Sequence, residues 1–404
     1  MPDVLEKELQ DLLLALIAVD SQNPSLVSGA DGEGAIADLI TGWAARAGLD
    51  VERIEPPPGR PSLLITAHGT APADTPSLLL CGHLDTVGVG DAGLVPRVEG
   101  DQVHGRGAYD MKGGVAAALV AMREAVRRRA PGDILLAAVA DEEYASLGIR
   151  DVLDTHARRH PGRPIADAAI VLEPTELAVV VAHRGFVWIE ITVNGIAAHG
   201  SRPHLGIDAI TGMASVITAL DARNTELRAT THPLLGPGFL HASTITGGTE
   251  PSTIPDRCTL VVERRTIPGE TVADVENEIE QTLAACRAAD PALTVSARTL
   301  LDRPPLETDP AHPFVRQIQE ATHHVAGVQS PIEGASYWAD SALIAATGIP
   351  TILLGPAGEG AHAAKEWVSL TSTLTCARTI LHTIERWTEA AASPRVFANQ
   401  LPAL

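Results

Sequence analysis

Cysteine and positive charge are both scarce in this sequence. Its 404 residues include four cysteines, Cys81, Cys258, Cys286 and Cys376, and no CxxC pair. So few thiols do not make a disulfide framework, and we expect reduced cysteines and a cytoplasmic protein. Lysine and arginine together number 30 against 50 acidic residues, which gives a net charge of −20. This charge argues against nucleic acid and anionic membranes as partners and favours small molecules.

Long apolar runs are missing as well. No stretch is long enough to span a bilayer. The first residues, MPDVLEKELQDLLLALIAVDS, carry acids throughout and alternate at helical spacing, unlike a secretory signal peptide. The apolar content of 45% nevertheless suffices for a large core. Because 404 residues are long for one domain, we expect two domains.

Short apolar runs that end abruptly in polar residues are what the sequence does contain. They are SLLLCGHLDT, DILLAAVADEE, DAAIVLEPT and IPTILLGPAGEGAH. Nearly continuous apolarity over about five residues is typical of parallel strands that are buried on both faces, and helices such as 113–129 separate them. The pattern predicts an α/β domain with a mostly parallel sheet and helices on both faces.

The segment that follows Arg184 has a different pattern. FVWIEITVNG alternates like a half-exposed strand, a helical stretch follows, and HASTITGG and CTLVVERRTI indicate two more strands. A second helix over 272–287 and a last strand, LTVSAR, complete the order βαββαβ, which predicts a small ferredoxin-like α+β domain. We therefore expect a first domain in two parts, 1–183 and 301–404, around an inserted domain at 184–300.

The segment VHGRGAYDMKGG contains enough glycine to suggest a nucleotide-binding loop. A dinucleotide fingerprint needs a third glycine three residues after Gly107, but that position is Asp110, which would repel a pyrophosphate. Four glycines, Gly105, Gly107, Gly113 and Gly114, permit backbone conformations that other residues avoid. We therefore interpret the segment as a turn that holds the carboxylate of Asp110.

Histidines and carboxylates follow the predicted strands. Open parallel sheets bind ligands beyond the carboxyl ends of their strands, so we expect these side chains to meet at one site. They are His83, Asp85, Asp110, Glu142, Glu143, Glu173 and His362. Each alone has an ordinary explanation, such as an acidic helix N-terminus or a turn. Together they concentrate negative charge that a divalent cation would offset.

Histidine with carboxylate and without thiolate favours Zn²⁺, and Co²⁺ and Mn²⁺ are alternatives. Asp110, inside the glycine turn, fits a carboxylate that bridges two ions. Asp85 lies two residues after His83, on the same side of the strand, so its carboxylate can orient the imidazole. Glu142 and Glu143 should diverge, so one can bind metal while the other takes a proton from water.

Seven motifs occur in order over almost the whole chain: CGHLDTVGVG, VHGRGAYDMKGG, VADEEYASLG, VLEPT, AAHGSRPHLGIDAI, STIPDRCTLVVERRTIPGE and GPAGEGAHAAKEWV. Together they resemble the superfamily of dinuclear zinc hydrolases that includes aminoacylase, acetylornithine deacetylase, succinyl-diaminopimelate desuccinylase and carboxypeptidase G. The resemblance implies two Zn²⁺ ions and hydrolysis of C–N bonds in amides, peptide bonds included. It also implies that His83 and Glu173 bind one ion, that Glu143 and His362 bind the other, and that Asp110 bridges them.

Further roles follow from the same resemblance. Glu142 matches the family's general base, and Asp85 matches the aspartate that steadies the histidine ligand. A cis peptide bond is expected between Asp110 and Met111. The inserted domain resembles the family's lid, which also forms the interface of a homodimer.

Residues of the inserted domain are assigned mainly by resemblance. His199 matches a lid histidine that reaches the partner subunit's active site, and Arg265 matches an arginine that receives a substrate carboxylate. Without the resemblance, both would be interpreted as surface residues. Arg184, at the domain junction, is either a hinge residue or an anion contact. Ser252 stands where many members have asparagine in N-x-I-P-D, and its single hydroxyl predicts a weaker or water-bridged contact.

The expected reaction is removal of an acyl group from an N-acyl amino acid by a dizinc-bound water, with Glu142 as general base. A dipeptidase or carboxypeptidase and a carbamoyl-amino-acid amidohydrolase are alternatives, because they differ only on the acyl side, which the ligands do not distinguish. An inactive metal-dependent binding protein is a remoter alternative, since it should have lost the base or some ligands and all of them are present.

Overall fold

The computed structural model describes residues 4–72 and 75–389, and the chain forms two compact units. The first comprises Met1–Val181, Thr308–Glu333 and Ala339–Leu404, and the second comprises Ala182–Glu307 and Gly334–Trp338. Residues 1–3, 73–74 and 390–404, which the sequence assigns to the first domain, lie outside the described residues.

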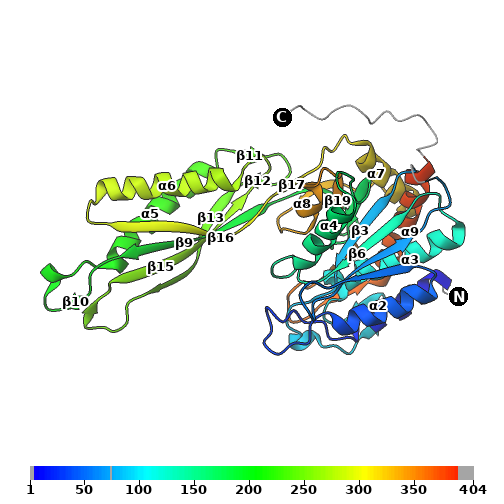
Figure 1. Cartoon of the computed structure of the whole chain (residues 1–404), viewed down its shortest axis with the longest axis horizontal. Helices are drawn as coiled ribbons and strands as arrows, with labels where there is room; N and C mark the ends of the chain where they lie inside the picture. The colour runs from blue at the N-terminus through cyan, green and yellow to red at the C-terminus, as the bar shows by residue number, and fades with distance from the viewer. Residues whose placement is uncertain (1–3, 73–74, 390–404) are drawn as a thin grey trace. The chain divides into compact units, whose positions relative to one another are not determined.

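A mixed β-sheet forms the centre of the first unit (Figure 1). Its strands are β1 (Asp50–Ile54), β2 (Ser62–Ala67), β3 (Leu78–His83), β6 (Ile134–Val139), β7 (Ala168–Val171), β8 (Val179–His183) and β19 (Thr351–Leu353). They follow the order β1-β2-β6-β3-β7-β19-β8, and β17 (Leu306–Glu307) and β18 (Ile332–Ala335) pair with β8. Strands β6, β3, β7 and β19 are mutually parallel, and the outer strands are antiparallel.

Alternate residues of the central strands face opposite layers of helices. Leu78 and Leu80 of β3 belong to one large hydrophobic cluster that contains residues of α1, α2, α3, α7 and α9. Leu79 and Cys81 are equally buried but lie outside that cluster, as the two-residue period of a strand requires. The helices are α1 (Val4–Ile17), α2 (Gly34–Arg46), α3 (Gly113–Arg128), α4 (Leu147–Arg159), α7 (Pro313–Ala326), α8 (Ser341–Ala345) and α9 (Leu370–Glu389). The predicted α/β fold class is therefore confirmed.

A small antiparallel sheet in the first unit joins segments that are far apart in the sequence. Its strands are β20 (Gly358–Glu359), β21 (Trp367–Ser369), β5 (Gln102–His104) and β4 (Arg97–Glu99), in that order, and the short helical turns η1 (Gly90–Ala92) and η2 (Ala108–Lys112) flank it in the chain. Trp367 pairs with His104. The pairing brings the segment around residue 362 beside the glycine turn.

The second unit has its own antiparallel sheet and its own core. Strands β9 (Gly185–Asn194), β13 (Phe239–Gly247), β15 (Arg257–Thr266) and β16 (Thr294–Arg303) follow the order β13-β15-β9-β16. Helices α5 (Ala209–Leu227) and α6 (Val272–Ala289) pack on this sheet, which gives the chain order βαββαβ that the sequence predicts. Two short antiparallel strand pairs are also present, β10 (Ala198–His199) with β14 (Thr253–Ile254) and β11 (Thr231–His232) with β12 (Gly236–Pro237). A short helical turn, η3, spans Pro203–Leu205. Among the helices of residues 4–72 and 75–389, none is long and apolar enough to cross a membrane.

Candidate metal centre

Three neighbouring parallel strands deliver the predicted side chains to one edge of the first unit's sheet. His83 is the last residue of β3, Glu142 and Glu143 follow β6, and Glu173 follows β7. Because β6, β3 and β7 are adjacent and parallel, their carboxyl ends lie together. The position of these side chains therefore follows from strand order.

The carboxylate of Asp110 lies between two imidazoles. Its Oδ1 is 3.0 Å from Nε2 of His83, and its Oδ2 is 3.3 Å from Nε2 of His362. The same His362 nitrogen lies 2.8 Å from Oε2 of Glu143. Potential ligand atoms lie within 4.8 Å of one another in the groups His83, Asp110 and Glu143, and His83, Glu142 and Glu173. The structure thus brings together all six residues of the predicted ligand set and base.

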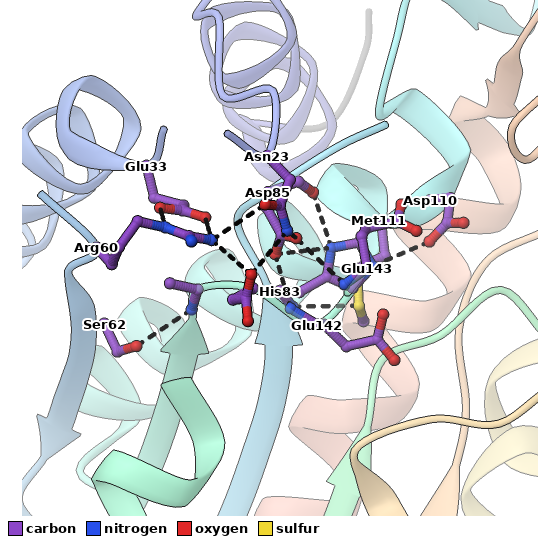
Figure 2. A network of polar contacts seen from close by, with 12 residues as sticks. Asn23, Glu33, Arg60, Ser62, His83, Asp85, Asp110, Met111, Glu142 and Glu143 are labelled. Carbon is purple, nitrogen blue, oxygen red and sulfur yellow. Dashed lines mark hydrogen bonds and ion pairs between the residues drawn. The ribbon is translucent and has the colours of Figure 1, made fainter. Parts of the chain in front are cut away.

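Asp85 supports the site differently from the sequence-based expectation. Its backbone carbonyl lies 2.9 Å from Nδ1 of His83, whereas its carboxylate Oδ1 is 3.8 Å from that nitrogen. The carboxylate instead accepts hydrogen bonds from the backbone N–H groups of Glu142, over 3.1 Å, and Glu143, over 3.2 Å. Asp85 therefore orients the imidazole through its carbonyl and fixes the Glu142 turn through its side chain (Figure 2).

The glycine turn has two kinds of glycine. Gly107 adopts a left-handed conformation with φ of 79°, and an added Cβ would lie 2.8 Å from Cγ2 of Thr86. Gly114, in the first turn of α3, has no such conformation; a Cβ there would lie 2.3 Å from the carbonyl oxygen of Leu172. The expectation of unusual backbone shape is therefore wrong at Gly114 and also at Gly113, whose φ is −60°, because close packing against neighbouring backbone explains both glycines. The expected cis peptide bond between Asp110 and Met111 is present.

Burial and mutual repulsion perturb the carboxylates. Burial raises the pKa of Glu173 to about 8, and the charge of Asp110 adds to this effect. Burial, with the charge of Glu173, also raises the pKa of Glu142 well above its usual range. The pKa of Glu143 is raised by burial and by Asp110. These carboxylates therefore lie where negative charge is poorly tolerated without a nearby cation.

Neighbouring carboxylates raise the pKa of both imidazoles, His83 and His362. Hydrogen bonds to Asp110 and Glu143 raise the pKa of His362 to about 10. Burial opposes the ionisation of Asp110, but its contacts with His362 and His83 hold its pKa below the usual range. Divalent cations would offset the same carboxylates and leave the imidazoles neutral, as metal binding requires. The donor set, with imidazole nitrogen and carboxylate oxygen and no thiolate, fits such ions.

The family model for peptidase family M20/M25/M40 matches residues 79–386. The chain belongs to this family. It is accordingly an M20 dinuclear metal hydrolase that acts on amide or peptide bonds, and the family typically binds two metal ions. The enzyme class predicted from the sequence is confirmed.

This M20 hydrolase is similar in sequence to a deacetylase and in fold to two peptidases. Acetylornithine deacetylase of Salmonella paratyphi B is 28% identical over 363 residues, which cover 86% of this chain and 88% of that protein. The aminopeptidase PepT from Bacillus cereus has a TM-score of 0.76 and 19% identity, covering 95% of this chain and 98% of its own. The M20 family metallo-carboxypeptidase Sso-CP2 from Sulfolobus solfataricus has a TM-score of 0.76 and 16% identity, and the match covers 95% of this chain and 99% of that chain. The two solved structures show a shared fold.

His199 and Ser252 of this M20 hydrolase both belong to the second unit, where they lie in neighbouring segments. His199, at the end of β10, is exposed, and its Nδ1 lies 2.8 Å from Oγ of Ser201. The backbone N–H of Gly200 donates to the carbonyl of Ser252 over 2.8 Å. The backbone of Ser252, directly before β14, therefore lies beside the histidine segment, in which His199 pairs with Thr253.

Arg265 and Arg184 form a positively charged pair in the second unit. The guanidinium of Arg265 lies over the ring of Phe186, 5.3 Å from its centroid, and forms an ion pair with Glu263. Arg184 donates to the carbonyl of Pro237 over 3.3 Å. Burial and the charge of Arg265 lower the pKa of Arg184. An anionic group at this pair would relieve the repulsion between the two guanidinium groups.

A buried polar network behind the Glu142 turn was not predicted. Arg60 donates to both carboxylate oxygens of Glu33, each over 2.8 Å, and to Oδ1 of Asp141 over 2.8 Å. Asn23 donates to the same Asp141 oxygen over 3.0 Å (Figure 2). Asp141 adjoins the predicted base within a quoted motif, but Asn23 and Arg60 lie in no motif that indicated the site.

Proposed function

We propose that this M20 hydrolase removes the acyl group from an N-acyl amino acid. The observation that carries the proposal is the crowding of Glu142, Glu143 and Glu173 around His83 and Asp110, which suits a hydrolytic metal pair. The acyl amino acid is favoured because the 28% identity to an acetylornithine deacetylase extends over 86% of the chain. Peptide hydrolysis is the second candidate, since the family is named for peptidases.

His83 and Glu173 would hold one Zn²⁺, Glu143 and His362 the other, and Asp110 would bridge them, with Co²⁺ or Mn²⁺ as alternatives. The 3.0 Å and 3.3 Å distances of the two Asp110 oxygens from separate imidazoles support the bridging role. When bound, such ions make water nucleophilic and polarise the substrate carbonyl.

Glu142 is the general base in this proposal. Its carboxylate takes the proton from the attacking water and returns it to the departing amine, so that a carboxylic acid and a free amino acid leave. The raised pKa of Glu142, caused by burial and by Glu173, suits a group that must accept and then donate a proton. Asp85 keeps this carboxylate in place through the backbone N–H of Glu142.

The second unit would supply substrate contacts and a dimer interface. Arg265, with Arg184 beside it, would bind the free α-carboxylate and so restrict the substrate to acylated amino acids. His199 would stabilise the oxyanion in the active site of the partner subunit of a homodimer. Ser252, beside the histidine segment, would provide a weaker polar contact to the substrate.

The test is release of free amine from N-acetyl, N-succinyl and long-chain N-acyl amino acids, N-carbamoyl amino acids and dipeptides. Zinc-loaded protein, metal-free protein and Glu142→Ala would be assayed side by side. Turnover of acyl amino acids that requires both metal and Glu142 supports the proposal. Turnover of dipeptides alone would favour the peptidase instead, and turnover of N-carbamoyl substrates alone would favour a carbamoylase.

A further inference from the structure

The carboxylate of Glu366 holds the backbone of the glycine turn. Its Oε2 accepts hydrogen bonds from Nη1 of Arg106 over 2.7 Å and from the N–H of Gly107 over 2.9 Å. Its Oε1 accepts from the N–H of Tyr109 over 2.9 Å and from that of Asp110 over 3.0 Å. Glu366 is 1% exposed, so these bonds replace water for three backbone groups of the turn.

The guanidinium of Arg106 extends the same contacts to the segment of His362. Its Nη2 donates to the carbonyl of Ala363 over 2.7 Å, and its Nε donates to the carbonyl of Gly88 over 2.9 Å. Arg106 is 3% exposed. One buried ion pair therefore contacts both the N–H of Asp110 and the carbonyl of the residue that follows His362.

We propose that Glu366 and Arg106 are positioning residues that fix Asp110 and His362 relative to each other, and thereby the spacing of the two metal ions. The inference rests on the ligand roles proposed above for these two residues. Neither Glu366 nor Arg106 offers a free ligand atom, because their polar atoms are engaged by the turn and by each other. Their effect on the metals must therefore pass through the backbone of the turn.

The position of this pair distinguishes it from an ordinary structural ion pair. A buried ion pair adds little net stability, because desolvation offsets its attraction. Here the carboxylate also accepts the N–H of Asp110 itself, so its loss would release the residue that lies between the two imidazoles. Groups that orient metal ligands affect metal affinity by about 10-fold to 100-fold.

The second unit contains a matched control. Arg264, 1% exposed, donates to Glu270 over 2.7 Å and 3.2 Å, and Glu270 also accepts the N–H of Ile267 over 2.8 Å. This ion pair resembles Arg106 and Glu366 in its buried arginine and in its contact with backbone, although the side chain of Glu270 is 22% exposed. It belongs to the unit that contributes none of the proposed ligands.

The experiment compares metal-free wild type, Glu366→Gln, Arg106→Gln and Glu270→Gln. Calorimetric titration with Zn²⁺ measures the number of ions and their affinities, and the absorption spectrum of the Co²⁺ forms reports ligand geometry. Thermal unfolding of the metal-free proteins measures stability. We expect Glu366→Gln to weaken the binding of both ions by about 10-fold to 100-fold and to alter the Co²⁺ spectrum. Arg106→Gln should weaken chiefly the ion of Glu143 and His362.

Glu270→Gln should lower stability yet bind two ions as wild type does. Glu366→Gln with wild-type affinities and an unchanged Co²⁺ spectrum would overturn the inference. If Glu366→Gln does not fold, wild-type metal binding by Arg106→Gln would overturn it equally. Wild-type protein that took up fewer than two ions would refute the ligand set and the positioning role together. No substrate is present, so failure of the acyl amino acid panel would leave this result unaffected.

Discussion

Asn23 donates a hydrogen bond from Nδ2 to Oδ2 of Asp85 over 2.8 Å, although 62 positions separate the two residues in the sequence. The same amide group contacts Asp141 over 3.0 Å. Asn23 is fully buried, and it therefore lies between two carboxylates that support the turn of Glu142 and Glu143. The geometry of the proposed base depends on this layer of residues behind it.

Arg60→Ala should destabilise the protein strongly. The side chains of Glu33 and Asp141 are 0% exposed, and the substitution would leave both without their cationic partner. Removing one member of a buried ion pair typically costs about 3 to 5 kcal/mol of unfolding free energy. Urea unfolding of the metal-free protein would measure the change.

The matched control for that prediction is Arg53→Ala. Arg53 pairs with Asp38, whose side chain is 75% exposed, so the loss should stay within about 1 kcal/mol. Equal effects of the two substitutions would show that the network around Arg60 is no more important to stability than a surface pair.

Most of the fold and the centre of the site could be predicted from sequence for a physical reason. Strands that are buried on both faces must be almost wholly apolar, so β3 and β6 are visible as runs, and the polar residues that follow them mark the sheet edge. The order of parallel strands then brings His83, Glu142 and Glu173 together without any knowledge of loop conformation.

Other parts of the site could not be predicted in this way. Asn23 and Arg60 act through side-chain contacts that span 27 to 118 positions, and such contacts leave no periodicity in the sequence. The two contacts of Asp85 illustrate the same limit, because the choice between its carbonyl and its carboxylate depends on backbone direction after β3. Spacing indicates that two groups can meet, but it does not indicate which atoms do.

Glu142→Gln and Glu143→Gln should have different effects despite their adjacency. If Glu142 is the base, Glu142→Gln should still bind two Zn²⁺ ions while kcat falls by about 100-fold or more. Glu143→Gln should lose affinity for the ion that it shares with His362, whose Nε2 lies 2.8 Å away.

Calorimetric metal titration together with steady-state kinetics would separate these two losses. Because bound metal stabilises the folded state, the rise in melting temperature on adding Zn²⁺ should persist in Glu142→Gln and shrink in Glu143→Gln. The reverse pattern would exchange the roles of the two glutamates.

Arg265→Gln should raise KM for N-acyl amino acids about 10-fold to 100-fold, the effect of losing a charged hydrogen bond to the α-carboxylate. The matching N-acyl amine, which lacks that carboxylate, should be turned over at the same rate by wild type and variant. Arg298→Gln is the control, because Arg298 pairs with Glu190 on an exposed strand position. A KM increase that is equal for both substrates would exclude carboxylate recognition by Arg265.

His199→Ala tests whether the exposed histidine acts in the partner subunit of the proposed homodimer. Each homodimeric variant, His199→Ala or Glu142→Ala, should be nearly inactive. A mixture of the two variants, refolded together or co-expressed, should regain activity. A mixed dimer has one site that combines the intact Glu142 of one chain with the intact His199 of the other. Random pairing makes half of the dimers mixed with one good site each, so roughly a quarter of wild-type activity is expected. If the histidine instead acted within its own chain, each chain of a mixed dimer would lack either His199 or Glu142. Neither site would then be complete, and the mixture would be inactive. An inactive mixture containing confirmed mixed dimers would therefore place His199 in its own subunit's site, whereas a fully active His199→Ala homodimer would place it outside catalysis.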